Sequence, residues 1–218
     1  MTTLRRLLSG LCLSLLASLP VSAASVYDLE LVVFLNNNTP SSEVDAANPE
    51  HAARLDRRLA QLFERVGGLD TGPGAGGRLA GVADRIDASP DYTLLQHVRW
   101  RQEVALISEA PWIDVSALTL GEDSGLKGVT RFYHTPLLYV DVFLRFTPFQ
   151  DPLTAGATAP PTAFGNLPLE ADMATAPSRF LEEKRRLKIN EVHYLDSARI
   201  GAIVGVWATE GESGATSQ

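Results

Sequence analysis

Several segments of the chain alternate between apolar and polar residues, which is the pattern of β-strands that bury one face. Residues 27–35 (YDLELVVFL) alternate at first and then become apolar on both sides, which predicts a central strand. Residues 91–104 and 127–146 alternate over longer stretches, and Pro136 is expected to bend or interrupt the second of them. Further β-segments are expected at 115–120, 181–190 and 198–208, with residues 191–197 as the turn between the last two.

Two helices are predicted between the first two long strands, because apolar residues recur there at helical spacing. Asn48 is a candidate N-cap for the first helix, and Pro49 fits its first helical position. Gly67 and Gly68 are expected to end this helix, and the second helix is expected at residues 78–88. The stripe of the first helix that should pack on the sheet comprises Leu55, Leu59, Leu62, Phe63 and Val66.

The order of these elements predicts the fold class. A strand followed by two helices and then by four or five strands with hairpin-like links indicates an α+β fold, with two helices packed on one face of a mostly antiparallel β-sheet. Residues 24–209 are expected to form a single domain, with a long low-complexity loop at 147–177 and a disordered tail at 210–218. The glycine-rich stretch at 68–77 lacks the Lys-Ser/Thr pair and the GxGxxG spacing of phosphate-binding loops, so we interpret it as a linker.

The N-terminus carries the three parts of a secretory signal peptide. Arg5 and Arg6 precede an apolar run over residues 7–19, and small residues follow around a candidate cleavage site after Ala23. The apolar run has about 13 residues, fewer than the roughly 20 that span a bilayer, which disfavours a membrane anchor. Residues 1–23 are therefore predicted to be removed on export.

Removal of this segment changes the composition of the chain. The single cysteine, Cys12, is lost, so ordinary core packing rather than disulfide bonds must stabilise the exported domain. Two arginines and no acidic residue are lost with it, so the net charge moves from −7 to −9. An acidic chain disfavours a nucleic-acid partner, and no second apolar run is long enough to span a membrane. We expect a protein of the bacterial periplasm.

Three histidines, His97, His134 and His193, lie in or near predicted strands, and Asp196 follows the last of them by three residues. A hydrolase or a metal-dependent enzyme could use these side chains if the fold brought them together. The chain has no HExxH motif, no GxSxG motif and, after export, no thiol. We therefore predict no catalytic residue, no metal and no cofactor, and enzyme activity is kept as an alternative.

Basic residues gather at strand positions of this acidic chain. Arg99 and Arg101 project with His97 from one face of the strand at 91–104, and antiparallel pairing could place them beside a second basic set. Arginine binds carboxylates through paired hydrogen bonds, so such a cluster is a candidate carboxylate site, and a solvated sheet face is the alternative. The other basic residues at strand positions are Arg131, Arg145, Lys184, Arg186 and Lys188.

Four segments carry motifs of a known family. They are residues 27–34 (YDLELVVF), 92–102 (YTLLQHVRWRQ), 128–134 (GVTRFYH) and 183–196 (EKRRLKINEVHYLD). In order and spacing they resemble the motifs of the CsiV family, which are periplasmic peptidoglycan-binding proteins of Gram-negative bacteria involved in cell shape. The third segment matches loosely and the fourth closely, and the resemblance covers most of the mature chain.

The resemblance implies a non-enzymatic periplasmic protein that binds peptidoglycan and supports cell-wall assembly and cell shape. A cell-wall synthase or its activator is a further candidate partner, and an adaptor that binds only a cell-envelope protein is the main alternative. Peptidoglycan offers free carboxylates on its stem peptides and flat faces on its sugars, which arginines and aromatic rings could bind. The candidate ligand-binding residues are Arg99, Trp100, Arg101, Arg131, Tyr133, His134, Arg186, His193 and Tyr194.

Overall fold

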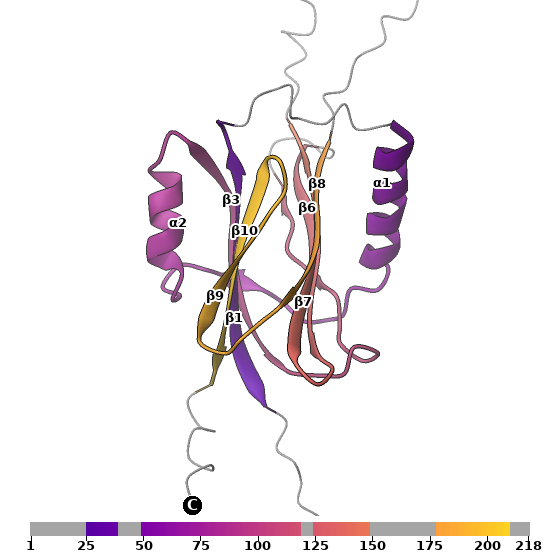
Figure 1. Ribbon diagram of the computed structural model, residues 1–218, viewed down its shortest axis with the longest axis vertical. Helices are drawn as coiled ribbons and strands as arrows, with labels where there is room; N and C mark the ends of the chain where they lie inside the picture. Colours follow the sequence, from indigo (N-terminus) through magenta and orange to yellow (C-terminus); the bar gives the residue numbers. More distant parts are fainter. Residues whose placement is uncertain (1–24, 39–48, 119–123, 149–177, 210–218) are drawn as a thin grey trace, which may run out of the picture.

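The strands form two antiparallel sheets that pack face to face (Figure 1). This computed structural model describes residues 25–38, 49–118, 124–148 and 178–209. The first sheet has the strand order β2-β3-β1-β10-β9, and the second has the order β4-β6-β7-β8, with β5 paired to β6. The strands are β1 (Val26–Asn36), β2 (Gly72–Pro73), β3 (Tyr92–Glu103), β4 (Ile113–Asp114), β5 (Ala117–Leu118), β6 (Gly125–His134), β7 (Leu138–Thr147), β8 (Arg179–Arg186), β9 (Glu191–Asp196) and β10 (Ile200–Ala208).

β1 lies at the centre of the first sheet, between β3 and β10. In this register Leu31 pairs with Val98 of β3 and with Val204 of β10. Alternate residues of β1 face the second sheet, while Val32 and Phe34 face the outer side, and both sets are buried. The prediction of a central strand that is apolar on both faces is therefore confirmed.

An apolar core fills the space between the two sheets. Leu29 of β1 and Phe132 of β6 are both fully buried in it, and Trp100 of β3 joins them. The indole Nε1–H of Trp100 donates a hydrogen bond to Gln102 Oε1 at 2.7 Å. Gln102 Nε2 in turn donates to the carbonyl oxygen of Phe132 at 3.1 Å, so one satisfied polar pair links the two sheets inside the core.

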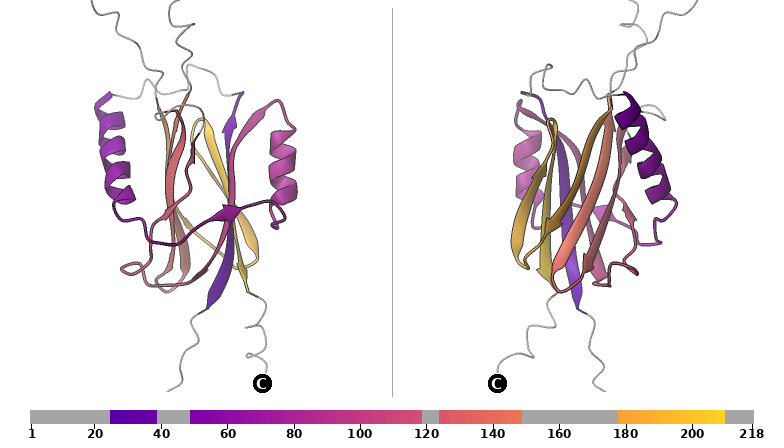
Figure 2. Two further views of the ribbon diagram at one scale, coloured as in Figure 1. Left: turned by 180° about the vertical axis from the view of Figure 1, so that it is seen from behind. Right: turned by 45° about the vertical axis from the view of Figure 1, so that its right-hand side comes forward.

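The two helices cover opposite outer faces of the molecule (Figure 2). α1 (Pro49–Phe63) packs its leucine stripe against Val129 and Phe143 of the second sheet, and α2 (Ala80–Asp87) packs against Val32 of the first sheet. The α+β class, with mostly antiparallel strands and two helices, is confirmed. The arrangement differs from a single sheet with both helices on one face, because each sheet has its own apolar outer patch for one helix to bury.

Local predictions around the hairpins had mixed outcomes. Residues 127–146 form the β6–β7 hairpin, and Pro136 lies in the turn that interrupts them, as predicted. The turn expected at residues 191–197 is wrong, because residues 191–196 form β9, which pairs with β10 at the edge of the first sheet. The glycine-rich linker contains β2, which pairs with β3 and keeps this segment against the first sheet.

Some predictions lie outside the described residues. They are the signal peptide at 1–23, most of the loop at 147–177 and the tail at 210–218. Among the residues that the structure describes, no helix combines the length and the apolar character needed to cross a membrane.

Candidate functional site

The basic residues that were predicted to gather lie on two different sheets. Arg99 and Arg101 belong to β3, which pairs with β1 and β2. Arg131 belongs to β6 and Arg186 to β8, with β7 between these two strands of the second sheet. Antiparallel pairing, which could have placed the two sets side by side, does not do so, because β3 and β8 belong to different sheets.

A groove of about 600 Å³ lies on the outer face of the first sheet, beside the chain segment around residues 70–78. We call it the motif groove, because its strand residues come from the family-like segments at 27–34 and 92–102. Positive and negative side chains alternate around it, so charged groups lie close to partners of opposite sign. Its charged lining residues are Asp28, Glu30, Asp70, Arg78, Arg99 and Arg101.

Glu30 forms the buried floor of the motif groove. Its carboxylate accepts the backbone N–H of Arg78 at 2.5 Å and that of Leu79 at 2.8 Å, directly before α2. The side chain of Leu79 provides no cap for α2, so Glu30 satisfies N–H groups at the start of this helix from across the sheet. His97 Nε2 lies 3.4 Å from the same carboxylate. These contacts make Glu30 a structural residue that fixes α2 and the preceding loop to β1.

Two glycines allow the loop to approach this floor. A Cβ atom on Gly77 would lie 2.5 Å from Glu30 Oε2, and one on Gly74 would lie 2.1 Å from His97 Cδ2. Because real Cβ atoms are not found this close to neighbouring atoms, any larger residue would displace the loop or the side chains beneath it. The shape of the motif groove therefore depends on glycine at both positions.

The three arginines of the motif groove differ in their partners. Arg101 donates from Nε and Nη2 to the two carboxylate oxygens of Asp28 at 2.7 and 3.2 Å, and this hydrogen bonding raises the pKa of Arg101. The guanidinium of Arg78 lies 5.1 Å from the ring centre of Trp207. The side chain of Arg99 is exposed and makes no hydrogen bond or ion pair with any residue that the structure describes. Arg99 is therefore a cation of this groove whose side chain has no partner among the described residues.

Arg131 and Tyr133, by contrast, are satisfied within the second sheet. Arg131 Nη2 donates to Asp141 Oδ2 at 2.5 Å, and its guanidinium lies 4.5 Å from the ring centre of Trp112 and 5.0 Å from that of Tyr133. The hydroxyl of Tyr133 donates to the other oxygen of Asp141 at 3.0 Å, and burial raises the pKa of Tyr133. Arg186 is exposed at the end of β8 and has no partner among the described residues. The side chains of Arg131, Tyr133 and Asp141 therefore satisfy one another, and Arg186 lies outside this group.

The remaining candidates lie apart from one another. Trp100 faces the core, so it offers no ring to a ligand. His134 Nδ1 lies 2.9 Å from the carbonyl of Thr135 at the β6–β7 turn. His193 Nε2 accepts the backbone N–H of Lys188 at 3.1 Å, and Tyr194 is 53% exposed on edge strand β9.

The three candidate histidines do not come together within the described part of the chain. His97 lies under the glycine loop of the first sheet, while His134 and His193 lie at the local contacts given above. No group of three histidine, cysteine or acidic side chains in the described ranges is arranged to hold a metal ion. The histidines therefore act as local hydrogen-bonding groups.

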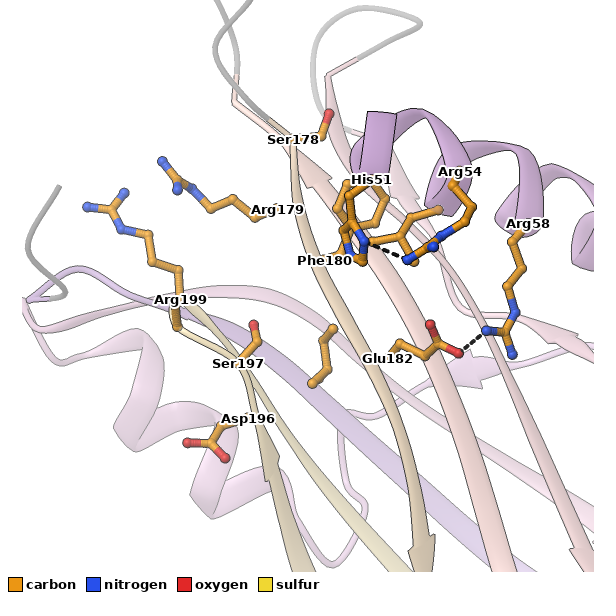
Figure 3. A pocket seen from close by; sticks show the side chains of 13 residues that line it. His51, Arg54, Arg58, Ser178, Arg179, Phe180, Glu182, Asp196, Ser197 and Arg199 are labelled. Carbon is orange, nitrogen blue, oxygen red and sulfur yellow. Dashed lines mark hydrogen bonds and ion pairs between the residues drawn. The ribbon is translucent and has the colours of Figure 1, made fainter. Parts of the chain in front are cut away.

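A second basic site was not found from the sequence. A pocket of about 450 Å³ lies between α1, the start of β8 and the turn between β9 and β10 (Figure 3). No local pattern predicts this pocket, because its basic residues come from three segments that are far apart in the chain. We call it the arginine pocket, and its charged or titratable lining residues are His51, Arg54, Arg58, Arg179, Glu182, Asp196 and Arg199.

Two arginines of this pocket have partners, and a third does not. Arg54 Nη2 lies 2.7 Å from His51 Nδ1, and Arg58 forms an ion pair with Glu182. The side chain of Arg179 makes no hydrogen bond or ion pair with a described residue, and burial, together with the nearby charge of Arg199, lowers the pKa of Arg179. Arg179 is therefore a cation of this pocket that no described side chain neutralises.

Comparison with known proteins gives one match. A protein-family model described as "Peptidoglycan-binding protein, CsiV" matches residues 6–208. No curated protein and no solved structure matches the chain.

Proposed function

Since the chain belongs to the CsiV family of peptidoglycan-binding proteins, we propose that it binds peptidoglycan in the periplasm, without catalysing a reaction, and supports cell-wall assembly and cell shape. The observation that carries this proposal is the extent of the family match, which runs from residue 6 to residue 208. The match includes both strands of the motif groove and all of the described elements.

The motif groove is the part of the surface that we assign to peptidoglycan. Arg99 projects into it without a partner among the described residues, and Arg78 and Arg101 line the same groove. Stem peptides carry free carboxylates, and an arginine can hold a carboxylate through two parallel hydrogen bonds. The acidic residues beside these arginines repel anions in general. They therefore restrict binding to ligands that place a carboxylate at Arg99.

An adaptor that binds only a cell-envelope protein is the second candidate function, and β9 favours it. This strand is at the edge of the first sheet and exposes Val192 by 52% and Tyr194 by 53%. Ile189, just before the strand, is 41% exposed. Exposed apolar side chains on an unpaired strand edge are typical of protein-binding surfaces.

Capture on purified peptidoglycan sacculi at several salt concentrations separates the two functions. The wild-type chain should be captured at low salt, and Arg99→Ala should bind about tenfold more weakly, the effect of losing one charge-assisted contact. Arg186→Ala is the matched control, because Arg186 is also exposed and unpaired among the described residues but belongs to the other sheet. Equal losses in both variants would contradict the assignment of the groove, and no capture of the wild-type chain would put the adaptor first.

Export has its own test. The mature chain purified from the periplasmic fraction of a Gram-negative host should begin at Ala24 or Ser25, because small residues precede both positions. Mass spectrometry of the intact protein measures this directly. A chain that keeps Met1 and stays in the membrane fraction would contradict a periplasmic protein.

A further inference from the structure

The arginine pocket is separate from the motif groove. It lies where the open edges of the two sheets meet, and α1 forms one of its walls (Figure 3). None of its lining residues lines the motif groove. A ligand in one site therefore leaves the other site accessible.

Basic residues outnumber acidic residues in its lining. Four arginines and His51 line the pocket, against the two acidic residues Glu182 and Asp196. Glu182 is already engaged by Arg58. In Figure 3 the side chains of Arg179 and Arg199 extend in the same direction, from the start of β8 and from the β9–β10 turn. Two guanidinium groups that face the same space repel each other, and a bound anion would remove this repulsion.

The position of α1 adds to this positive field. His51 and Arg54 lie in its first two turns, and the dipole of a helix makes its N-terminal end favourable for anions and unfavourable for cations. Glu50 in the first turn offsets part of this basic charge, so the helix dipole itself is what favours an anion at this end of α1. Arg179, half-buried and without a described side-chain partner, lines the same pocket but extends away from His51 and Arg54 (Figure 3).

The lining also contains an apolar part. Leu55 of α1 and Phe180 and Leu181 of β8 contribute carbon surface beside the arginines. A volume of about 450 Å³ falls within the range of small-molecule sites. The combination suits a short ligand that has a negative head and a small apolar body.

We propose that the arginine pocket binds a short peptide through its free terminal carboxylate, with Arg179 as the principal contact and the apolar lining against the peptide's small side chains. This proposal does not depend on the motif groove. The peptide can be free in solution or attached to the cell wall, because both present the same carboxylate.

Titration of the full mature chain with N-acetyl-Ala-Ala, followed by NMR chemical shifts, tests the proposal. The acid should bind in the millimolar range or better, and the same dipeptide with a C-terminal amide should bind at least about tenfold more weakly. Arg179→Gln should lose about tenfold in affinity for the acid. Arg186→Gln is the matched control on the same strand and should bind like the wild type. Arg54→Gln, an exposed helix position, provides a second variant if Arg179→Gln fails to fold.

The outcomes separate this site from the proposed function. Arg179→Gln should keep its capture on sacculi if the groove alone holds the wall. Loss of sacculus capture in Arg179→Gln would assign the pocket to wall-attached carboxylates, and unchanged capture would assign it to free peptides. Equal binding of acid and amide, equal binding by the wild type and the folded Arg179 variant, or no shift at about 10 mM dipeptide would overturn the proposal.

Discussion

The motif groove and the arginine pocket both carry several arginines, but their charges are held in different ways. In the groove three arginines face three acidic residues, and Arg101 and Glu30 are engaged in short contacts within the fold. In the pocket the basic side chains outnumber the acidic ones, and Arg179 lacks a described partner. The difference separates charge that the fold itself neutralises from side chains such as Arg99 and Arg179, which have no ionic partner among the described residues.

The strongest test of this comparison removes the acidic floor of the groove. Glu30→Ala deletes the acceptor of two backbone N–H groups at the start of α2 and leaves both in a buried place. Hydrogen bonds to a charged group contribute about 1.5 to 3 kcal/mol each, so we expect a loss of about 4 kcal/mol in the free energy of unfolding. Denaturant melts measure this loss. Glu103→Ala, on exposed β3 surface, is the control and should cost less than about 0.5 kcal/mol.

A second prediction concerns the helix that forms one wall of the pocket. Leu59 of α1 is 3% exposed and packs with Trp112, Val129 and Phe143. Leu59→Ala should cost about 3 kcal/mol, because it removes buried carbon and leaves a cavity. Gln61→Ala, exposed on the same helix, should change stability little. In the Leu59 variant, the rate of amide hydrogen exchange should increase more in α1 than in α2, relative to the wild type. An equal increase in both helices would mean that they do not dock on separate sheets.

A third prediction tests whether the groove needs its close loop approach. Gly77→Ala would place a methyl group against the Glu30 carboxylate, so we expect a loss of about 2 kcal/mol and weaker capture on sacculi. Gly81→Ala is the control inside α2, where the new methyl group would meet only Arg85 Nη1 at 3.8 Å. Alanine favours helices over glycine by up to about 1 kcal/mol, so the control should be slightly more stable than the wild type. Denaturant melts of the two variants should therefore move in opposite directions.

These contrasts also explain what the sequence could predict. Part of the motif groove could be predicted from the sequence. Alternation places Asp28 and Arg101 on the outer face of their strands, and they lie opposite each other once β1 and β3 pair. The contacts of the buried Glu30 could not be predicted, because Glu30 binds a backbone N–H group 48 residues later in the chain. Trp100 and Tyr133 were candidates for ligand contact, yet they are buried, as aromatic residues at strand spacing usually are.

The arginine pocket lay beyond sequence reasoning for a geometric reason. Arg54 belongs to α1, Arg179 to the start of β8 and Arg199 to the β9–β10 turn, and no periodic pattern connects these positions. Their meeting requires that the strands divide into two sheets with α1 over the second one. The alternation pattern indicates strands but not which sheet each strand joins. A prediction of one sheet therefore could not include a pocket at the place where two sheets meet.

The smallest effect that we predict is a change in melting temperature on replacing Arg179. The direction of this change distinguishes a ligand site from a structural cluster. Arg179→Gln removes a half-buried charge that repels Arg199, so the variant without ligand should melt about 1 to 2 °C above the wild type. Arg58→Gln is the control with the opposite sign, because it breaks the ion pair with Glu182 and should melt slightly lower. N-acetyl-Ala-Ala well above the wild-type Kd should reverse the order of wild type and Arg179→Gln, since the chain with the smaller Kd gains more stability at the same ligand concentration. Thermal melts with and without the dipeptide measure both steps. If Arg179→Gln instead melts lower than the wild type without ligand, Arg179 contributes to the fold, and the contrast between the two sites would no longer hold.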